Sequence, residues 1–249
     1  MNIVRFSLFS ALTLATSLWA ALTIAQAQPT ASAASANSSP KPIAIPESHH
    51  QTSQRSVSVD GVAATLNRYE RRDGRNAGLG GEHFSTLIAT DGTLKGFASI
   101  SLDLVGKPLP SRERSEQIAI AFLRESAPDL LPHMRISGTA PHDEPIRVRG
   151  SGGEETVQLS GMRVKARNTS DGSWFWVVVG ADEKPLLFER DLQWSNLRFR
   201  RTTEEWLHDR WLRGLGPDGN PIVGSIKNNP QAHIPLSEWL KGKSWNYPN

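Results

Sequence analysis

Three consecutive segments with strand periodicity, linked by short turns, constrain the fold of this chain more than any other feature. They are Met162–Arg167, Trp174–Val179 and Leu186–Trp194, and the links between them are rich in Asn, Ser, Gly and Asp. Alternating apolar and polar residues are typical of strands with one buried face, and the link residues favour tight turns. The sequence therefore predicts a three-stranded antiparallel meander.

The two faces of this meander follow from parity, because successive side chains of a strand point to opposite sides. The middle segment is apolar on both faces, so its neighbours decide which face is buried. If both hairpins close symmetrically, one face forms the core, with Met162, Val164, Ala166, Phe175, Val177, Val179, Leu186 and Phe188. A one-residue bulge in either turn would reverse part of this assignment.

The opposite face carries the candidate ligand-binding residues. Two indoles lie there between a basic row and an acidic row: Trp174 and Trp176, then Arg163, Lys165 and Arg167, then Glu189 and Asp191. Trp combines a large apolar area with a hydrogen-bond donor, and flanking charges would orient a peptide or a saccharide. The alternative is structural: the charges pair across the strands, and a last helix covers the indoles through Trp206 and Trp211.

Other elements are predicted from similar patterns. His83–Ala89 and Leu94–Leu104 have strand character and flank the turn residues Asp91-Gly92. Ser111 is placed as the N-cap of a helix that runs to Ser126. Residues 137–153 read as loops around a short strand at Ile146–Arg149.

A second helix is expected near the C-terminus. Thr202-Thr203-Glu204-Glu205 has the spacing of a capping box, and Gly214 is placed to close the helix. The folded part then spans residues 56–215, which fits a single α+β domain with an antiparallel sheet, one main helix and a C-terminal helix.

The N-terminus reads as a cleavable secretory signal over residues 1–27. Arg5 precedes an apolar run, and Ala25-Gln26-Ala27 puts small residues at the positions that a signal peptidase reads, so we expect cleavage between Ala27 and Gln28. The alternative is a membrane anchor, because the run approaches the roughly 20 residues that cross a bilayer. Cleavage would leave no membrane span, and the mature protein would be periplasmic or secreted.

The segments on either side of the domain have few large apolar residues. Residues 28–55 are rich in Ala, Ser and Pro, which predicts a disordered linker, and residues 216–249 are a tail rich in Gly, Pro and Asn. The chain has no cysteine, so it forms neither disulfides nor thiolate metal sites. The whole chain has a formal charge of +3, which gives little support for binding to nucleic acid.

Signals for catalysis are weak. His142-Asp143-Glu144 and His208-Asp209 supply titratable groups, but their spacing does not bring them together, and adjacent residues seldom converge on one metal ion. The sequence contains no zincin motif, nucleophile elbow or phosphate-binding glycine loop. We therefore name no catalytic residue, metal or cofactor. A hydrolase using His142, Asp143 or His208 remains the alternative, because catalytic groups converge only in space.

Gly96–Leu104, Ser111–Arg124 and Trp174–Phe188 follow one another in an order that resembles the PepSY-like domains of exported bacterial proteins. The residues that carry the resemblance include the run Gln117-Ile118-Ala119-Ile120-Ala121, and Val177, Val179, Gly180 and Asp182. The resemblance implies a curved antiparallel sheet that grips a helix, and a role in inhibition or assisted folding through binding.

The sequence thus predicts a binding or inhibitory module without catalytic activity. Its expected partner is a protein or an extended peptide in the cell envelope. A cell-envelope hydrolase and a structural envelope protein are the two alternatives.

Overall fold

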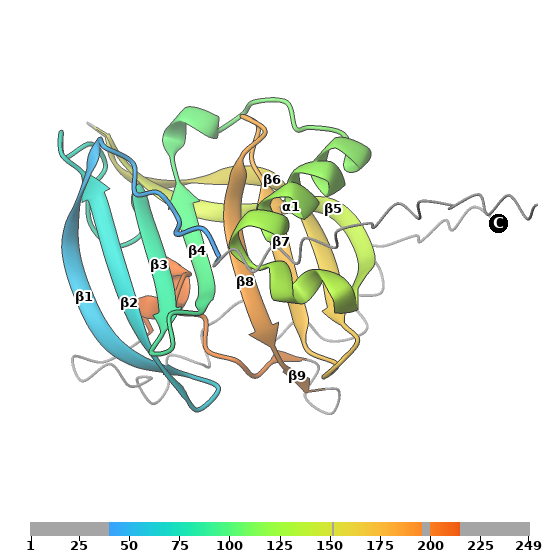
Figure 1. Ribbon diagram of the computed structural model, residues 1–249. Helices are drawn as coiled ribbons and strands as arrows, with labels where there is room; N and C mark the ends of the chain where they lie inside the picture. The colour runs from blue at the N-terminus through green and yellow to red at the C-terminus, as the bar shows by residue number, and fades with distance from the viewer. Residues whose placement is uncertain (1–39, 151, 196–199, 215–249) are drawn as a thin grey trace, which may run out of the picture. The chain divides into compact units, whose positions relative to one another are not determined.

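The computed structural model describes residues 40–150, 152–195 and 200–214, and its main feature is one antiparallel sheet of eight strands (Figure 1). The strands lie in the order β1-β2-β3-β4-β8-β7-β6-β5. Their bounds are β1 His49–Val59, β2 Val62–Arg71, β3 His83–Ala89, β4 Leu94–Ile100, β5 Met134–Gly150, β6 Gly153–Asn168, β7 Trp174–Val179 and β8 Pro185–Leu192. Two short strands, β9 Trp194–Ser195 and β10 Arg200–Arg201, form a separate pair.

Each half of the sheet is a four-stranded meander. β1 to β4 pair in chain order, β5 to β8 do the same, and β4 and β8 join the halves through pairs such as Phe97 with Phe188. The predicted meander is confirmed, because Met162 pairs with Val179, and Val177 pairs with Phe188. The first predicted strand pair is also present, although β4 ends at Ile100, and Leu102–Leu104 form the 3-10 helix η1.

The predicted α+β class, with one main helix on a curved sheet and a C-terminal helix, is wrong. The structure is mostly the eight-stranded sheet, and its few helices are short. Residues 137–153 were expected to be mainly loop, but most of them belong to the long strands β5 and β6. Pro141 and Pro145 suggested a loop, yet β5 is an edge strand, where proline is tolerated because one side of the strand needs no ladder hydrogen bonds.

The expected C-terminal helix is reduced to α2, Asp209–Leu212. The Thr203 hydroxyl accepts a hydrogen bond from the backbone N–H of Gln193 at 2.8 Å, so it joins this segment to the end of β8. Trp206 and Leu207 are each buried against the sheet. These contacts hold the segment in a non-helical path.

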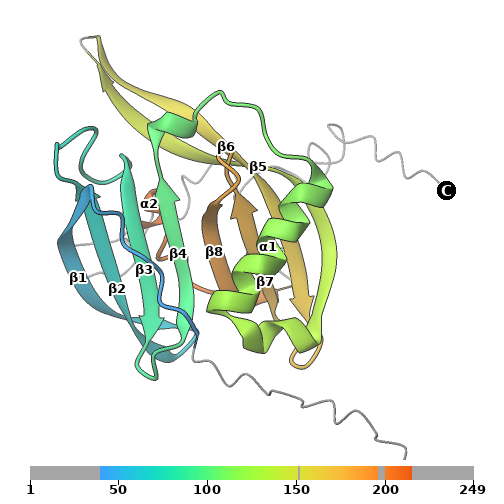
Figure 2. The ribbon, with the colours of Figure 1, turned by 45° about the horizontal axis from the view of Figure 1, so that its top comes forward.

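Helix α1, Arg112–Ser126, packs on one face of the β5–β8 half (Figures 1 and 2). The Ser111 side chain accepts a hydrogen bond from the Arg114 N–H, which confirms the predicted N-cap. The buried Ala119 and Leu123 face the apolar side chains of β6 to β8. The 3-10 helix η2, Pro128–His133, follows α1 and leads into β5. This face contains the predicted core residues Val164, Ala166, Phe175, Val177, Val179 and Phe188.

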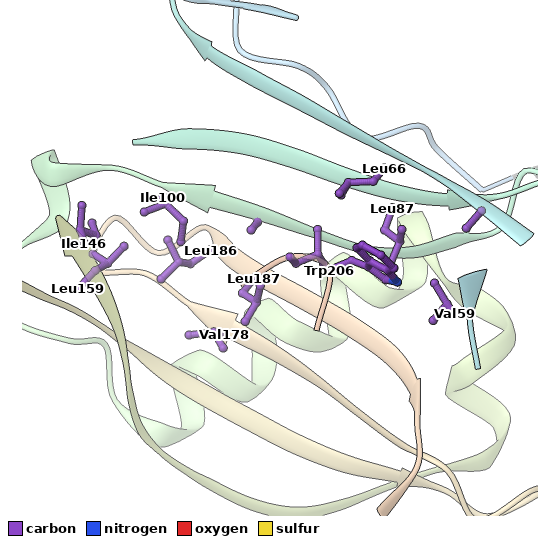
Figure 3. Packing of buried hydrophobic residues seen from close by; sticks show 13 residues of the cluster. Val59, Leu66, Leu87, Ile100, Ile146, Leu159, Val178, Leu186, Leu187 and Trp206 are labelled. Atoms are coloured by element: carbon purple, nitrogen blue, oxygen red, sulfur yellow. The ribbon is translucent and has the colours of Figure 1, made fainter. Parts of the chain in front are cut away.

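The opposite face has its own apolar cluster (Figure 3). Trp206 lies in it near Leu87 and Leu66, and its indole N–H donates to the Ser58 carbonyl at 2.8 Å. α2 lies behind β3 and β4, on the side away from α1 (Figures 1 and 2). Leu186 belongs to this cluster rather than to the predicted one, because the β7–β8 register shifts between Val178 and Val179. The central strands of the sheet are therefore covered by apolar clusters on both faces.

The predicted boundary between the linker and the folded domain differs from the structure. β1 begins at His49, so the last residues of the predicted linker are strand. The predicted signal, the cleavage site between Ala27 and Gln28, and the tail lie outside the described residues. In the part of the chain that the structure describes, no helix has the length and apolar character needed to cross a membrane.

Candidate functional site

The candidate site is built on β6 and β7, on the face opposite α1. We call Arg163, Lys165, Arg167, Trp174 and Trp176 the tryptophan–cation strip. The register places Arg167 opposite Trp174 and Lys165 opposite Trp176, as predicted. Along β6 and β7 these residues alternate with apolar residues that are buried on the α1 face. Because successive side chains of a strand point to opposite sides, the strip residues share the other face.

The cations of the strip lie over the faces of its indoles. Lys165 Nζ is 4.2 Å from the ring centre of Trp174, and the Arg167 guanidinium carbon is 5.5 Å from the same ring. The Arg163 guanidinium carbon is 5.7 Å from the ring centre of Trp176. Lys165 also lies 5.9 Å from the ring centre of Trp194, whose residue is 49% exposed. These distances are those of cation–π contacts.

The basic row does not pair with the acidic row. Among the described residues, none of the three cations has a carboxylate oxygen within 4.0 Å. Arg167 is exposed and sits directly opposite Arg135 of β5, which is exposed as well. Burial lowers the pKa of Lys165, and the charge of Arg163 lowers it further. Arg163 Nη1 lies 3.3 Å from His142 Nδ1, and the charge of Glu144 acts on Arg163 from beyond ion-pair distance. Lys165 and Arg167 therefore carry positive charge that the described residues leave without an acidic partner.

Glu189 lies beside the strip, as predicted, but its carboxylate is occupied by other groups. It is opposite Trp176, and the indole N–H of Trp176 donates to Oε2 at 3.1 Å. Arg201 donates to both carboxylate oxygens, at 2.7 and 3.0 Å. Burial would raise the pKa of Glu189, but Arg201 and His208 outweigh that effect and lower the pKa to about 2.

Asp191 does not lie beside Glu189 on the strip. The β7–β8 register shifts between the partners of Trp174 and Trp176, and Asp191 has a φ of 59°. Its carboxylate accepts from Lys95 at 2.6 Å and from its neighbour Arg190, which also binds Asp129 of η2 on the α1 side. This local bulge separates Asp191 from the tryptophan–cation strip.

A buried ionic cluster continues from the strip towards α2. His208 Nε2 lies 3.0 Å from Glu189 Oε2, and its Nδ1 lies 3.2 Å from Glu144 Oε1. Burial alone would lower the pKa of His208, but the two carboxylates outweigh it and raise the pKa to about 10. Burial would raise the pKa of Glu144, but His208 and His142 hold it well below its ordinary value. We call Glu144, Glu189, Arg201 and His208 the buried ionic cluster.

The residues named for the hydrolase alternative are only partly brought together. His142 Nε2 lies 2.7 Å from Glu144 Oε1, so Glu144 bridges His142 and His208. Asp143 is exposed and accepts from the Ser160 hydroxyl at 2.6 Å, away from both histidines. The cavity beside His208 and Glu144 has a volume of about 10 Å³. A cavity of that size holds about one water molecule.

A second ionic group lies next to the first. Asp209, the residue after His208, accepts hydrogen bonds from Nη1 and Nη2 of Arg68 at 2.7 and 3.1 Å, and from the backbone N–H of Gly80 at 2.5 Å. The buried His83 lies 3.6 Å from the same carboxylate. Two consecutive residues thus anchor α2 to opposite halves of the sheet. In the described residues no three His, Asp or Glu side chains are placed to hold a metal ion.

Comparison of this chain with known proteins finds no significant match. No family model matches it, and neither a curated protein nor a solved structure is significantly similar. The resemblance to PepSY-like domains remains a prediction, and the function has to be argued from the site itself.

Sequence reasoning missed the buried ionic cluster. Its members come from β5, β8, β10 and the residue before α2, so no local spacing connects them. The signal in the sequence was weak: charged residues such as Glu144 and Glu189 stand between apolar neighbours on strands. Buried charges are usually paired, which would have predicted a partner but not its identity.

Proposed function

We propose that this chain is an exported binding module without catalytic activity, and that it recognises a protein or an extended peptide in the cell envelope. The observation that carries the proposal is the tryptophan–cation strip. Its indoles are half-buried, its cations have no carboxylate partner among the described residues, and the exposed Trp194 extends it. Aromatic residues and arginines that combine apolar area with directional donors are the usual anchors of protein interfaces.

Two features of the neighbouring ionic cluster support a role without catalysis. A histidine whose pKa is about 10 stays protonated near neutral pH, so His208 does not serve as a general base there. The cavity beside it, about 10 Å³, has room for about one water molecule. The buried ionic cluster instead fixes Trp176 through Glu189, and so holds one side of the strip in place.

The test is capture of a partner from envelope extract by the purified mature chain. We expect Trp174→Ala to lose the captured partner while the thermal midpoint stays within a few degrees, because Trp174 makes cation–π contacts worth about 0.5–1 kcal/mol each. Leu79→Ala is the matched control, since it removes an exposed apolar side chain elsewhere. Equal capture by wild type and Trp174→Ala would contradict the proposal, as would hydrolytic activity lost in His142→Ala.

A further inference from the structure

The repeat of positive charge along β6 indicates the chemistry of the partner. Arg163, Lys165 and Arg167 occupy alternate positions of one strand, so their side chains leave the same face at intervals of about 6.8 Å. An extended peptide presents its own alternate side chains at the same interval. A segment lying along β6 with an acidic residue at every second position would therefore place one carboxylate near each cation.

The charge balance of this face favours an acidic partner. Arg135 and Arg167 are cross-strand neighbours of like charge, an arrangement that destabilises a sheet unless an anion lies between them. The two carboxylates nearest the strip do not supply that anion. Glu189 is held by Arg201 and His208, and Glu144 is held by His142 and His208.

The indoles of the strip offer apolar surface that a small inorganic anion would leave uncovered. Trp174 is within cation–π distance of both Lys165 and Arg167, and Trp194 is within that distance of Lys165. An extended segment whose carboxylates reach the cations would lay its backbone and aliphatic carbons against these rings. This fits a peptide better than polyphosphate, which offers no apolar surface between its charges.

We propose that the tryptophan–cation strip, extended by Arg135 and Trp194, binds an extended acidic segment of a partner protein, with alternate carboxylates facing Arg163, Lys165 and Arg167. This inference rests on the proposed binding function and names the partner's chemistry. Arg135 and Arg167 bind the end of the segment together. The indoles of Trp174 and Trp194 pack on its aliphatic carbons.

The experiment uses two synthetic peptides of identical composition. One alternates Glu with Ser, and the other collects the same Glu residues in one block and the same Ser residues in another. Fluorescence polarisation with the mature chain should show tighter binding of the alternating peptide, weakened about tenfold or more between about 50 mM and about 300 mM salt, because exposed charges are screened. Lys165→Gln and Arg167→Gln should each weaken it about threefold to fivefold.

Matched controls remove exposed cations from other surfaces. Lys107→Gln and Arg124→Gln change the net charge by the same amount but lie in the loop before α1 and on α1 itself, so they should leave the affinity unchanged. Equal weakening in these controls would show a general charge effect and would overturn the inference. Equal affinity for the two peptides would overturn the proposed alignment along β6.

Two further outcomes separate this inference from the proposed function. If an envelope protein is captured equally well by wild type, Lys165→Gln and Arg167→Gln but not by Trp174→Ala, the binding function stands and the acidic segment is wrong. If polyphosphate or a single-stranded oligonucleotide binds more tightly than the alternating peptide, the strip is a site for phosphate polymers, and the inference is also overturned.

Discussion

His208 and Glu189 form a buried ion pair, with 3.0 Å between Nε2 and Oε2, in which each residue keeps the other charged. The pair connects the segment before α2 to the middle of the sheet. Glu189 also accepts a hydrogen bond from the indole N–H of Trp176, so the ion pair helps to fix the position of one indole of the tryptophan–cation strip. The stability of this part of the fold should therefore depend on His208.

The first prediction concerns the loss of this imidazolium. His208→Ala leaves Glu144 and Glu189 buried with one cationic partner fewer, and breaking a buried pair in this way costs about 3–5 kcal/mol. Urea unfolding should show that decrease in the free energy of unfolding. His133→Ala is the control, because His133 is exposed and should cost less than about 0.5 kcal/mol. A similar small effect for His208→Ala would contradict the ion pair.

The second prediction concerns pH. The folded pKa of His208, about 10, lies above its ordinary value of 6.5, so its contribution is complete below about pH 6.5 and disappears as the pH rises towards 10. The folded pKa of Glu189, about 2, lies below its ordinary value of 4.5, so its contribution is complete above about pH 4.5 and disappears as the pH falls towards 2. The cluster should stabilise the fold most between these limits.

Thermal midpoints of wild type and His208→Gln across this range check the sign. The difference between the two proteins should be largest near pH 5.5 and should shrink on the alkaline side, because only wild type loses a proton from this site. Comparing the two proteins cancels the titration of groups that do not contact His208. A difference that stays constant from pH 7 to pH 9.5 would show that His208 is already neutral in the folded state at pH 7.

The two faces of the meander could be predicted from the sequence only where the strands pair without a bulge. Parity placed Arg163, Lys165 and Arg167 beside Trp174 and Trp176 correctly, because the β6–β7 hairpin closes without a register shift. The same reasoning failed at Leu186 and Asp191, because β7 and β8 pair with two irregularities. A bulge of one residue moves every later side chain to the other face, and nothing in the local sequence marks where it falls.

The extent of the sheet was harder to predict than its centre. β5 contains two prolines and several charged residues, so its pattern resembles a loop, although its long pairing with β6 makes it a strand. β1 is polar and exposed over most of its length, and its strand conformation depends on pairing with β2. Such strands are specified by their neighbours rather than by their own periodicity. The buried ionic cluster was beyond prediction for the same reason, since distant strands bring its members together.

The third prediction separates the roles of the two strip indoles. Trp176 packs against the apolar cluster around Leu187 and donates to Glu189, so Trp176→Ala should cost about 2–4 kcal/mol. Trp174 mainly contacts cations, so Trp174→Ala should cost about 1 kcal/mol. Urea unfolding of both variants provides the comparison. Equal large losses would indicate that both indoles serve the core, and the strip would then not be a binding surface.

The last prediction concerns Gly96, which lies opposite Glu189 on the face that Leu207 covers. A Cβ atom there would come within 2.5 Å of the Phe188 carbonyl oxygen and within 2.6 Å of Leu207 Cδ1. Gly96→Ala should therefore force β4 from β8 or displace Leu207, at a cost of about 1–3 kcal/mol. Gly138→Ala is the matched control, since a Cβ at that position meets no atom within 4 Å. The double variant Gly96→Ala/Leu207→Ala should relieve only the side-chain part of the clash, because the Phe188 carbonyl oxygen stays in place. A double-mutant cycle on the free energies of unfolding should therefore give a coupling energy smaller than the cost of Gly96→Ala alone. A Gly96→Ala variant as stable as Gly138→Ala would mean that the segment before α2 does not pack on the sheet here, and the buried ionic cluster would lose the packing that keeps it dry.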